Sequence, residues 1–123
     1  MKNNFCKIYI SSKAAENQIH DILKNVATLN YLFFEVVTFI DKNSDYDDLE
    51  ELKFPDGFLS FKYLLNLDFV DSEKENDCIN YVNEILSVLW REKIPAVASC
   101  DYEHLLLRNG GYSDEEVFCL SHK

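Results

Sequence analysis

Apolar residues recur with the spacing of regular secondary structure through most of this chain. In Cys6–Ser11, Ile8 and Ile10 fall on one face of an extended segment, which predicts a strand. Ala14–Ala27 follows with apolar residues at i, i+3, i+4 and i+7, so one face of a helix is apolar. These residues are Ile19, Ile22, Leu23 and Val26. The chain is therefore expected to begin with a strand and an amphipathic helix.

Two longer apolar segments come next, with a polar connection between them. Tyr31–Ile40 is rich in aromatic and β-branched residues and is apolar on both faces, which suits a covered strand. Phe58–Val70 alternates between apolar and polar residues, which predicts a long, half-buried strand. Its inward positions are Leu59, Phe61, Tyr63, Leu65, Leu67 and Phe69. The connection Asp41–Gly57 contains a predicted helical turn at Asp47–Leu52.

The second half of the chain repeats the order of helix and strand. Asp71–Asp77 is a polar connection, and the helix that follows it ends at Arg91, shortly before Pro95. The apolar positions of this helix include Ile79, Val82, Ile85, Leu86 and Leu89. Ala96–Cys100 is a short apolar segment and a predicted strand.

The order strand, helix, strand, strand, helix, strand predicts one α+β domain over residues 1–123. This β-α-β-β-α-β order is that of the ferredoxin-like sandwich, an antiparallel sheet with two helices on one face. A C-terminal extension begins at Asp101, with a helical turn expected in Glu103–Arg108, a turn at Gly110-Gly111 and a last strand at Val117–Leu120. Many unrelated functions use this fold, so the function has to be read from its residues.

Charge narrows the class of partner. The chain has 12 Lys and Arg against 22 Asp and Glu, which gives a net charge of -10. Nucleic acid and anionic membrane surfaces would repel such a chain, whereas a basic protein would attract it. The same charge would also serve solubility alone. No apolar stretch is long enough for a membrane span and no signal peptide is recognised, so we expect the cytoplasm.

Catalytic and metal-binding patterns are weak. The three histidines are isolated in sequence, and the four cysteines form no CxxC pair, so they are expected to be thiols. Asp41, Asn43 and Asp45 fit the first ligand positions of a calcium loop, but Tyr46 occupies its glycine position. Glycine-rich phosphate loops are absent from the sequence. We therefore expect no metal, no cofactor and no enzymatic activity.

The strongest candidate for a binding surface is the acidic connection between the second and third predicted strands. Seven carboxylates face only two lysines in Asp41–Asp56, and two aromatic side chains there could serve as anchors. A solvated acidic loop would have the same composition. The candidate partner-binding residues are Asp41, Asp45, Tyr46, Asp47, Asp48, Glu50, Glu51, Phe54 and Asp56.

Together these features resemble the small acidic immunity proteins of bacterial contact-dependent inhibition and other polymorphic toxin systems. The resemblance rests on the acidic Asp41–Asp56 connection, on the strand FLSFKYLLNLDF, and on WREKIPAVASCDY ahead of NGGY. It implies a protein made beside a secreted toxin, often a nuclease. Such a protein binds the toxin domain in the cytoplasm and covers its active site.

Three hypotheses follow. The first is an immunity protein, not an enzyme, that neutralises a basic toxin domain. The second is a ferredoxin-like domain that binds a small molecule or regulates through oligomerisation. The third is a small enzyme that uses Cys100 as nucleophile with His104 as base, since a thiol needs a base to become a thiolate.

Overall fold

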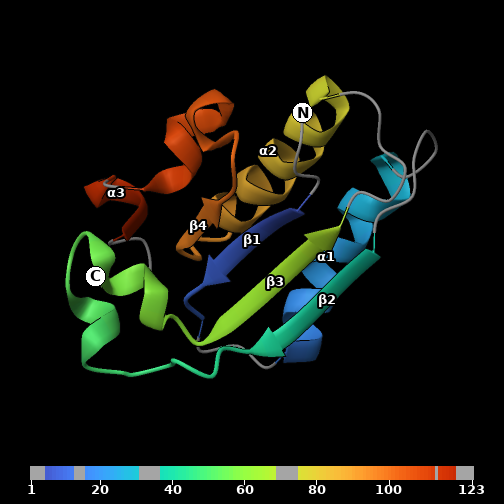
Figure 1. Ribbon diagram of the computed structural model, residues 1–123. Coiled ribbons are helices and arrows are strands. Elements are labelled where there is room, and N and C mark those ends of the chain that lie inside the picture. The colour runs from blue at the N-terminus through green and yellow to red at the C-terminus, as the bar shows by residue number, and fades with distance from the viewer. Residues whose placement is uncertain (1–4, 13–15, 31–36, 69–74, 113, 119–123) are drawn as a thin grey trace.

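The computed structural model describes residues 5–12, 16–30, 37–68, 75–112 and 114–118. It is an α+β structure, which confirms the predicted fold class (Figure 1). The helices and strands within these residues are β1 (Phe5–Ile10), α1 (Glu16–Asn30), β2 (Val37–Lys42), β3 (Tyr63–Asp68), α2 (Glu75–Arg91), β4 (Ala96–Ser99) and α3 (Glu115–Phe118).

The strands form a four-stranded sheet in the order β2-β3-β1-β4 across the described residues. Every neighbouring pair is antiparallel, and Ile8 on β1 lies opposite Leu65 on β3 and Ala98 on β4. Residues directly opposite one another point to the same side of a sheet. These three side chains therefore share one face, and α1 and α2 both lie on that side (Figure 1).

The main core lies between this face and the two helices. Leu86 and Leu89 of α2 are fully buried there with Ile19 of α1, as the helical spacing of apolar residues predicted. Fully burying one leucine stabilises the fold by roughly 1.5–3 kcal/mol before entropy is counted. The two predicted helices and the strands predicted at Cys6–Ser11 and Ala96–Cys100 are thus confirmed, with shifts of a few residues at their ends.

The opposite face of the sheet carries a second, smaller core that the sequence did not predict. Phe58, Phe61 and Phe118 are buried there on Val97 of β4, and Tyr9 of β1 packs against them. Tyr9 and Phe58 meet edge to face, with ring centroids 5.3 Å apart. The chain between β2 and β3 and the C-terminal extension therefore cover part of the face that the helices leave open.

This second core explains why the predicted strand Phe58–Val70 is wrong at its start. β3 begins only at Tyr63, and Asp56–Ser60 forms a 3-10 turn. The turn places Phe61 on the opposite face from Tyr63, although strict alternation would put both on the same face. Leu59, predicted to point inward, is 48% exposed.

Two other predictions need correction or lie outside the described residues. The strand predicted at Val117–Leu120 is wrong for its first two residues, since α3 ends at Phe118; the rest is outside the described residues. The strand predicted at Tyr31–Ile40 is confirmed from Val37 onward, and residues 31–36 lie outside the described residues. Residues 69–70 of the third predicted strand and most of the second polar connection, 71–74, also lie outside.

The predicted turn at Gly110-Gly111 is confirmed. Both glycines have positive φ, and a Cβ on Gly111 would lie 2.8 Å from the carbonyl oxygen of Ala96. The turn thus allows the extension to approach β4 closely.

In the part of the chain that the structure describes, no helix combines the length and the apolar character needed to cross a membrane.

Candidate functional site

The connection between β2 and β3 has a backbone held by specific contacts. Asn43 is buried, and its Nδ2 donates to the carbonyl oxygens of Leu59 and Phe61, both at 2.9 Å. Its Oδ1 accepts a hydrogen bond from the backbone N–H of Asp45 at 3.0 Å. One side chain therefore ties the beginning of the connection to its end. The amide is engaged within the protein, which leaves it unsuited to the calcium-loop position considered from the sequence.

Two further residues shape the middle of the connection. Asp47 Oδ1 accepts hydrogen bonds from the backbone N–H groups of Leu49 and Glu50, at 2.9 and 3.0 Å, just before the 3-10 turn Glu50–Leu52. These hydrogen bonds lower the pKa of the Asp47 carboxyl below its ordinary value. A Cβ on Gly57 would lie 2.7 Å from the carbonyl oxygen of Glu51, so only glycine fits where the two turns meet.

Large apolar side chains are exposed on this connection, next to the carboxylates that the sequence analysis proposed for partner binding. Leu49 is 72% exposed and Phe54 is 40% exposed. The other large apolar residues exposed on the connection are Tyr46, Leu52 and Leu59. The exposed carboxylates among them are Asp41, Asp45, Asp47, Asp48, Glu50 and Asp56. We refer to these eleven residues as the acidic–apolar surface.

Glu51 differs from the other predicted residues because it is only partly exposed. Ser11 Oγ lies 3.5 Å from Glu51 Oε2 and donates a hydrogen bond to it, which ties the connection to the end of β1. Burial raises the pKa of the Glu51 carboxyl above its ordinary value, and the hydrogen bond from Ser11 opposes that shift. Glu51 is therefore mainly a contact inside the protein.

The C-terminal extension borders the acidic–apolar surface, which the sequence did not predict. Phe54 packs edge to face on Phe118, with ring centroids 5.4 Å apart. Tyr112 Oη donates to Asp56 Oδ1 at 3.3 Å, and its ring lies 5.7 Å from that of Phe58. The sequence signal for this neighbour was the exposed aromatic residue directly after Gly110-Gly111, where a tight turn brings it back to the sheet.

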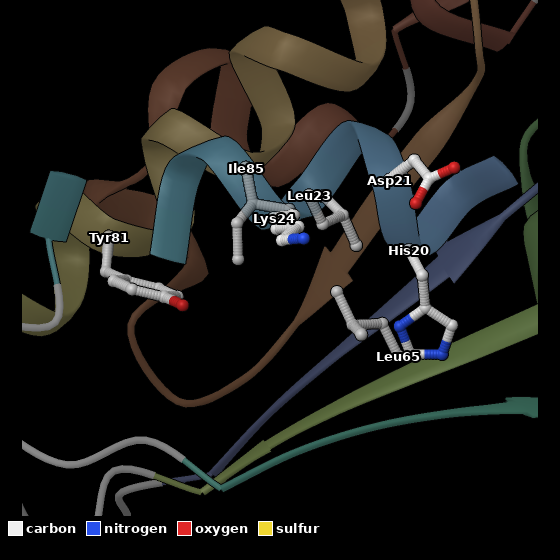
Figure 2. Close-up of a pocket in the computed structure, with 7 residues that line it drawn as sticks. All are labelled: His20, Asp21, Leu23, Lys24, Leu65, Tyr81 and Ile85. Atoms are coloured by element: carbon white, nitrogen blue, oxygen red, sulfur yellow. The ribbon is translucent and has the colours of Figure 1, made fainter. Parts of the chain in front are cut away.

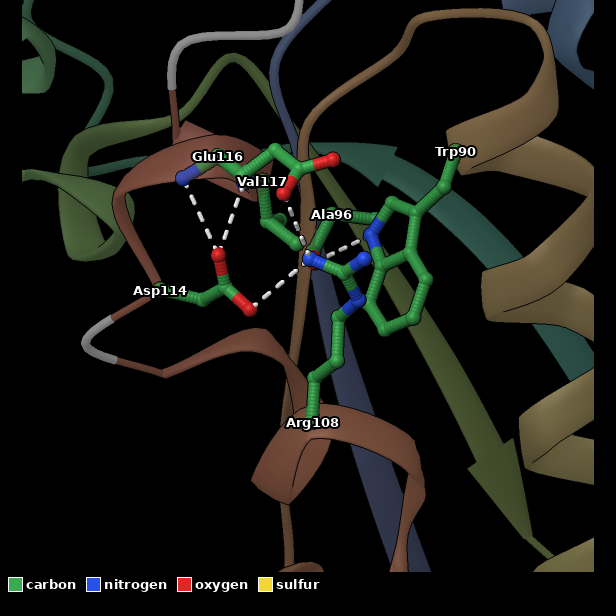
Figure 3. A network of polar contacts seen from close by, with 6 residues as sticks. All are labelled: Trp90, Ala96, Arg108, Asp114, Glu116 and Val117. Carbon is green, nitrogen blue, oxygen red and sulfur yellow. Dashed lines mark hydrogen bonds and ion pairs between the residues drawn. The ribbon is translucent and has the colours of Figure 1, made fainter.

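A shallow, polar hollow of about 530 Å³ lies beside Phe54. Arg108 crosses it, with its guanidinium 3.1 Å from Asp114 Oδ2 and 3.4 Å from Glu116 Oε2 (Figure 3). Its lining residues are Phe54, Arg108, Asn109, Tyr112, Asp114, Glu115 and Glu116. The basic group is neutralised by two carboxylates, so this hollow adds acidic rather than basic character to the surface.

Trp90 has a structural role close to this region. Its Nε1 donates to the carbonyl oxygen of Ala96 at 3.0 Å, and the ring packs against the main core (Figure 3). The indole thus joins the end of α2 to the start of β4. The turn at Gly110-Gly111 of the extension lies close to the same residues.

A second hollow lies on the other side of the sheet, between the two long helices. It measures about 300 Å³ and its walls are mainly apolar (Figure 2). Leu65 reaches it from β3, Tyr81 and Ile85 come from α2, and the rest come from α1. The α1 residues are His20, Asp21, Leu23 and Lys24.

The described residues do not gather ligands for a metal. No group of three or more His, Cys, Asp or Glu side chains among them is arranged to hold a metal ion. Cys100 is half-buried and His104 is exposed. The Cys100 side chain packs against the main core and interacts with Cys6 and with the backbone N–H of Tyr102. The backbone N–H of Cys100 donates to Glu103 Oε2 at 3.4 Å, and no hydrogen bond among the described residues joins Cys100 to His104.

Comparison with known proteins returns no relative. No protein-family model, no curated protein and no solved structure matches this chain.

Proposed function

We propose that this chain is an immunity protein that binds a basic toxin domain, most simply a nuclease, and covers its active site. The observation that carries the proposal is the acidic–apolar surface. Exposed apolar side chains alternate there with carboxylates, on a connection whose backbone is held by Asn43, Asp47 and Gly57. The cytoplasm of the producing cell is the proposed site of action.

The two kinds of side chain have different roles in such a surface. Carboxylates attract a basic partner over distance and raise the rate of association. Apolar anchors, once desolvated by the partner, provide most of the binding energy. Leu49 and Phe54 are the proposed anchors, and Phe54 is already oriented by Phe118. A preorganised anchor loses little side-chain entropy on binding.

The finer fold assignment belongs to this proposal. In a ferredoxin-like sandwich, two β-α-β units interlock so that each holds a strand of the other between its own strands. The units here would be β1-α1-β2, which encloses β3, and β3-α2-β4, which encloses β1. This arrangement would direct the connection between β2 and β3 away from the helices.

The test uses the domain encoded by the reading frame next to this chain's gene as the toxin probe. The expected result is a complex whose association slows as salt rises from about 0.05 to about 0.5 M, because the Debye length shortens. The chain should also suppress the toxin's hydrolytic activity and restore growth on co-expression. A probe that forms no complex would refute the immunity function.

Two matched triple variants locate the surface. Reversing Asp41, Asp45 and Asp48 to lysine should slow association about tenfold at physiological salt. The control reverses three exposed carboxylates elsewhere, at Asp21, Glu92 and Asp101, with the same change in net charge. Equal slowing in both would show that net charge alone matters and would remove the acidic–apolar surface from the proposal.

The apolar anchors are tested separately. Phe54→Ala or Leu49→Ala should speed dissociation about tenfold or more, with little change in association. Leu107→Ala is the control, since Leu107 is 48% exposed and lies on the extension, where its backbone N–H donates to Asn83 Oδ1 of α2. Dissociation rates unchanged by either anchor variant would contradict the assigned roles.

The hollow between α1 and α2 favours a second candidate function, the binding of a small molecule. Its volume, about 300 Å³, lies at the lower end of the range for ligand pockets. A ligand that fills it should raise the Tm, and the shift should grow with the logarithm of the ligand concentration above Kd. Leu23→Trp, which narrows the hollow, should abolish that shift, whereas the surface variants above should leave it unchanged.

A further inference from the structure

Two cysteines far apart in sequence lie at one end of two neighbouring strands: Cys6 is on β1, and Cys100 directly follows β4. β1 pairs with β4 so that Lys7 lies opposite Ser99. The next residues outward from this pair are Cys6, on β1, and Cys100, just past the end of β4. Cys6 shares the helix-facing side with Ile8, and Cys100 also packs against the main core. The fold therefore brings together two thiols that are separated by most of the chain.

The two thiols differ in exposure and in acidity. Cys6 is 1% exposed, whereas Cys100 is only half-buried. Interaction with the Cys6 side chain, followed by a hydrogen bond from the backbone N–H of Tyr102, lowers the pKa of the Cys100 thiol against the effect of burial. The same pairing with Cys100, together with burial, raises the pKa of the Cys6 thiol. Cys100 is thus the accessible thiol of the pair and the more readily ionised one.

The Tyr102 side chain lies close to both thiols. Tyr102 is 2% exposed, and its hydroxyl is the one buried side-chain polar atom, among those the structure describes, that has no hydrogen-bond partner. Burial, and then the neighbouring Cys6, Cys100 and Cys78, raise the pKa of Tyr102 well above its ordinary value. The hydroxyl therefore stays protonated and remains available to donate to an anionic sulfur beside it.

We propose that Cys100 is a site of reversible oxidation by peroxides, with Cys6 as the cysteine that resolves it to a disulfide. The Cys100 thiolate attacks one peroxide oxygen, the O–O bond breaks, and Cys100 becomes a sulfenic acid as hydroxide leaves. The Cys6 sulfur then attacks the Cys100 sulfur, the S–O bond breaks, and water leaves. Two thiols lose two electrons and two protons in total, and one hydrogen peroxide is reduced to two waters.

The product fits the sheet. Continuing the register of Lys7 and Ser99 by one position places Cys6 opposite Cys100. Directly opposite residues on antiparallel strands have Cα atoms about 4.5–5.5 Å apart, and disulfides span about 4.4–6.8 Å. The bond can thus form without separating the strands. It would join the start of β1 to the segment that leads from β4 into the C-terminal extension.

The test treats the whole folded chain with excess hydrogen peroxide, then counts thiols that react with a maleimide in denaturant. The count should fall from four to two and return to four after dithiothreitol. Trypsin under non-reducing conditions should yield residues 3–7 joined to residues 94–108, the peptides that contain Cys6 and Cys100. A cross-link between any other pair, or an unchanged thiol count, would overturn the proposal.

Variants separate the roles of the two thiols. Cys100→Ser should abolish the thiol loss. Cys6→Ala should leave a sulfenic acid at Cys100, which dimedone traps. Cys78→Ala combined with Cys119→Ala keeps only the proposed pair, and both remaining thiols should be lost on oxidation. Should Cys6→Ala fail to fold, as circular dichroism would show, the peptide map of the unaltered chain still decides the question. Thiol loss that persists in Cys100→Ser would refute the assignment.

Discussion

The two faces of the sheet are covered in different ways, and they differ in how much apolar surface they leave exposed. The face under α1 and α2 is covered mainly by aliphatic side chains, most of them at regular helical and strand positions. The opposite face is covered by short turns from the β2–β3 connection and the extension, through a few aromatic contacts. Large apolar side chains stay exposed beside this second core. The first face therefore carries most of the buried core, and the second lies beside the surface that we propose for partner binding.

The largest expected effect comes from the helix-covered face. Leu86→Ala removes a fully buried side chain and should lower the free energy of unfolding by about 2–5 kcal/mol. Leu49→Ala, the same substitution on the acidic–apolar surface, should change it by less than about 0.5 kcal/mol. Denaturant unfolding followed by circular dichroism measures both. A similar loss of unfolding free energy in the two variants would contradict the conclusion that the helix-covered face provides most of the stability.

A smaller effect is expected where the connection is tied together. Asn43→Ala removes the two hydrogen bonds to the carbonyl oxygens of Leu59 and Phe61 and should cost about 1–3 kcal/mol. Amide hydrogen exchange should rise mainly in the connection, while α2 keeps its protection. Asn80→Ala, on an exposed position of α2, is the control and should be nearly neutral. Equal exchange in the connection before and after Asn43→Ala would contradict the assigned role.

The smallest effect is a difference in pH dependence between two carboxylates of the same connection. The pKa of Asp47 is lowered in the folded protein by its backbone hydrogen bonds, so its stabilisation is present above the unfolded pKa, about 3.9, and is lost as pH falls through the folded pKa. Asp47→Asn keeps the acceptor oxygen but removes the charge. It should lower the Tm at pH 7, and the loss should disappear as pH falls through the lowered folded pKa of Asp47.

Glu51 should behave in the opposite sense. Its folded pKa is raised, first of all by burial, so its favourable contribution is present below the unfolded pKa, about 4.3, and is lost as pH rises through the folded pKa. Glu51→Gln should therefore leave the Tm at pH 7 equal to or above that of the unaltered chain. A Tm series from pH 3 to 8 by differential scanning calorimetry measures both variants. Parallel curves for the two would contradict the opposite shifts.

The helix-covered face could be predicted from the sequence because its elements are periodic. Ile8 and Ile10 on β1 and the apolar positions of α2 repeat at intervals that match strand and helix geometry. The intervals follow from local backbone geometry and do not depend on the rest of the chain. The exposed acidic residues of the connection were predictable for a similar reason, since a dense run of carboxylates rarely leaves the surface.

The second face could not be predicted in this way. Phe58 and Phe61 read as positions of an alternating strand, but they belong to a 3-10 turn and to a separate core. Their burial depends on Tyr9 and Phe118, which are distant in sequence, so no local pattern records it. The same holds for Tyr112 beside Asp56 and for Cys6 beside Cys100, which come together only when the strands pair.

The sequence by itself thus determined the class of fold, the helices and strands with regular periodicity, and the concentration of negative charge on one connection. Tertiary structure alone decided which apolar side chains remain exposed among those charges, which carboxylate becomes an internal contact, and which thiols become neighbours. The physical reason is that periodicity and charge are properties of neighbouring residues, whereas burial and contact depend on segments that meet only after the sheet has formed.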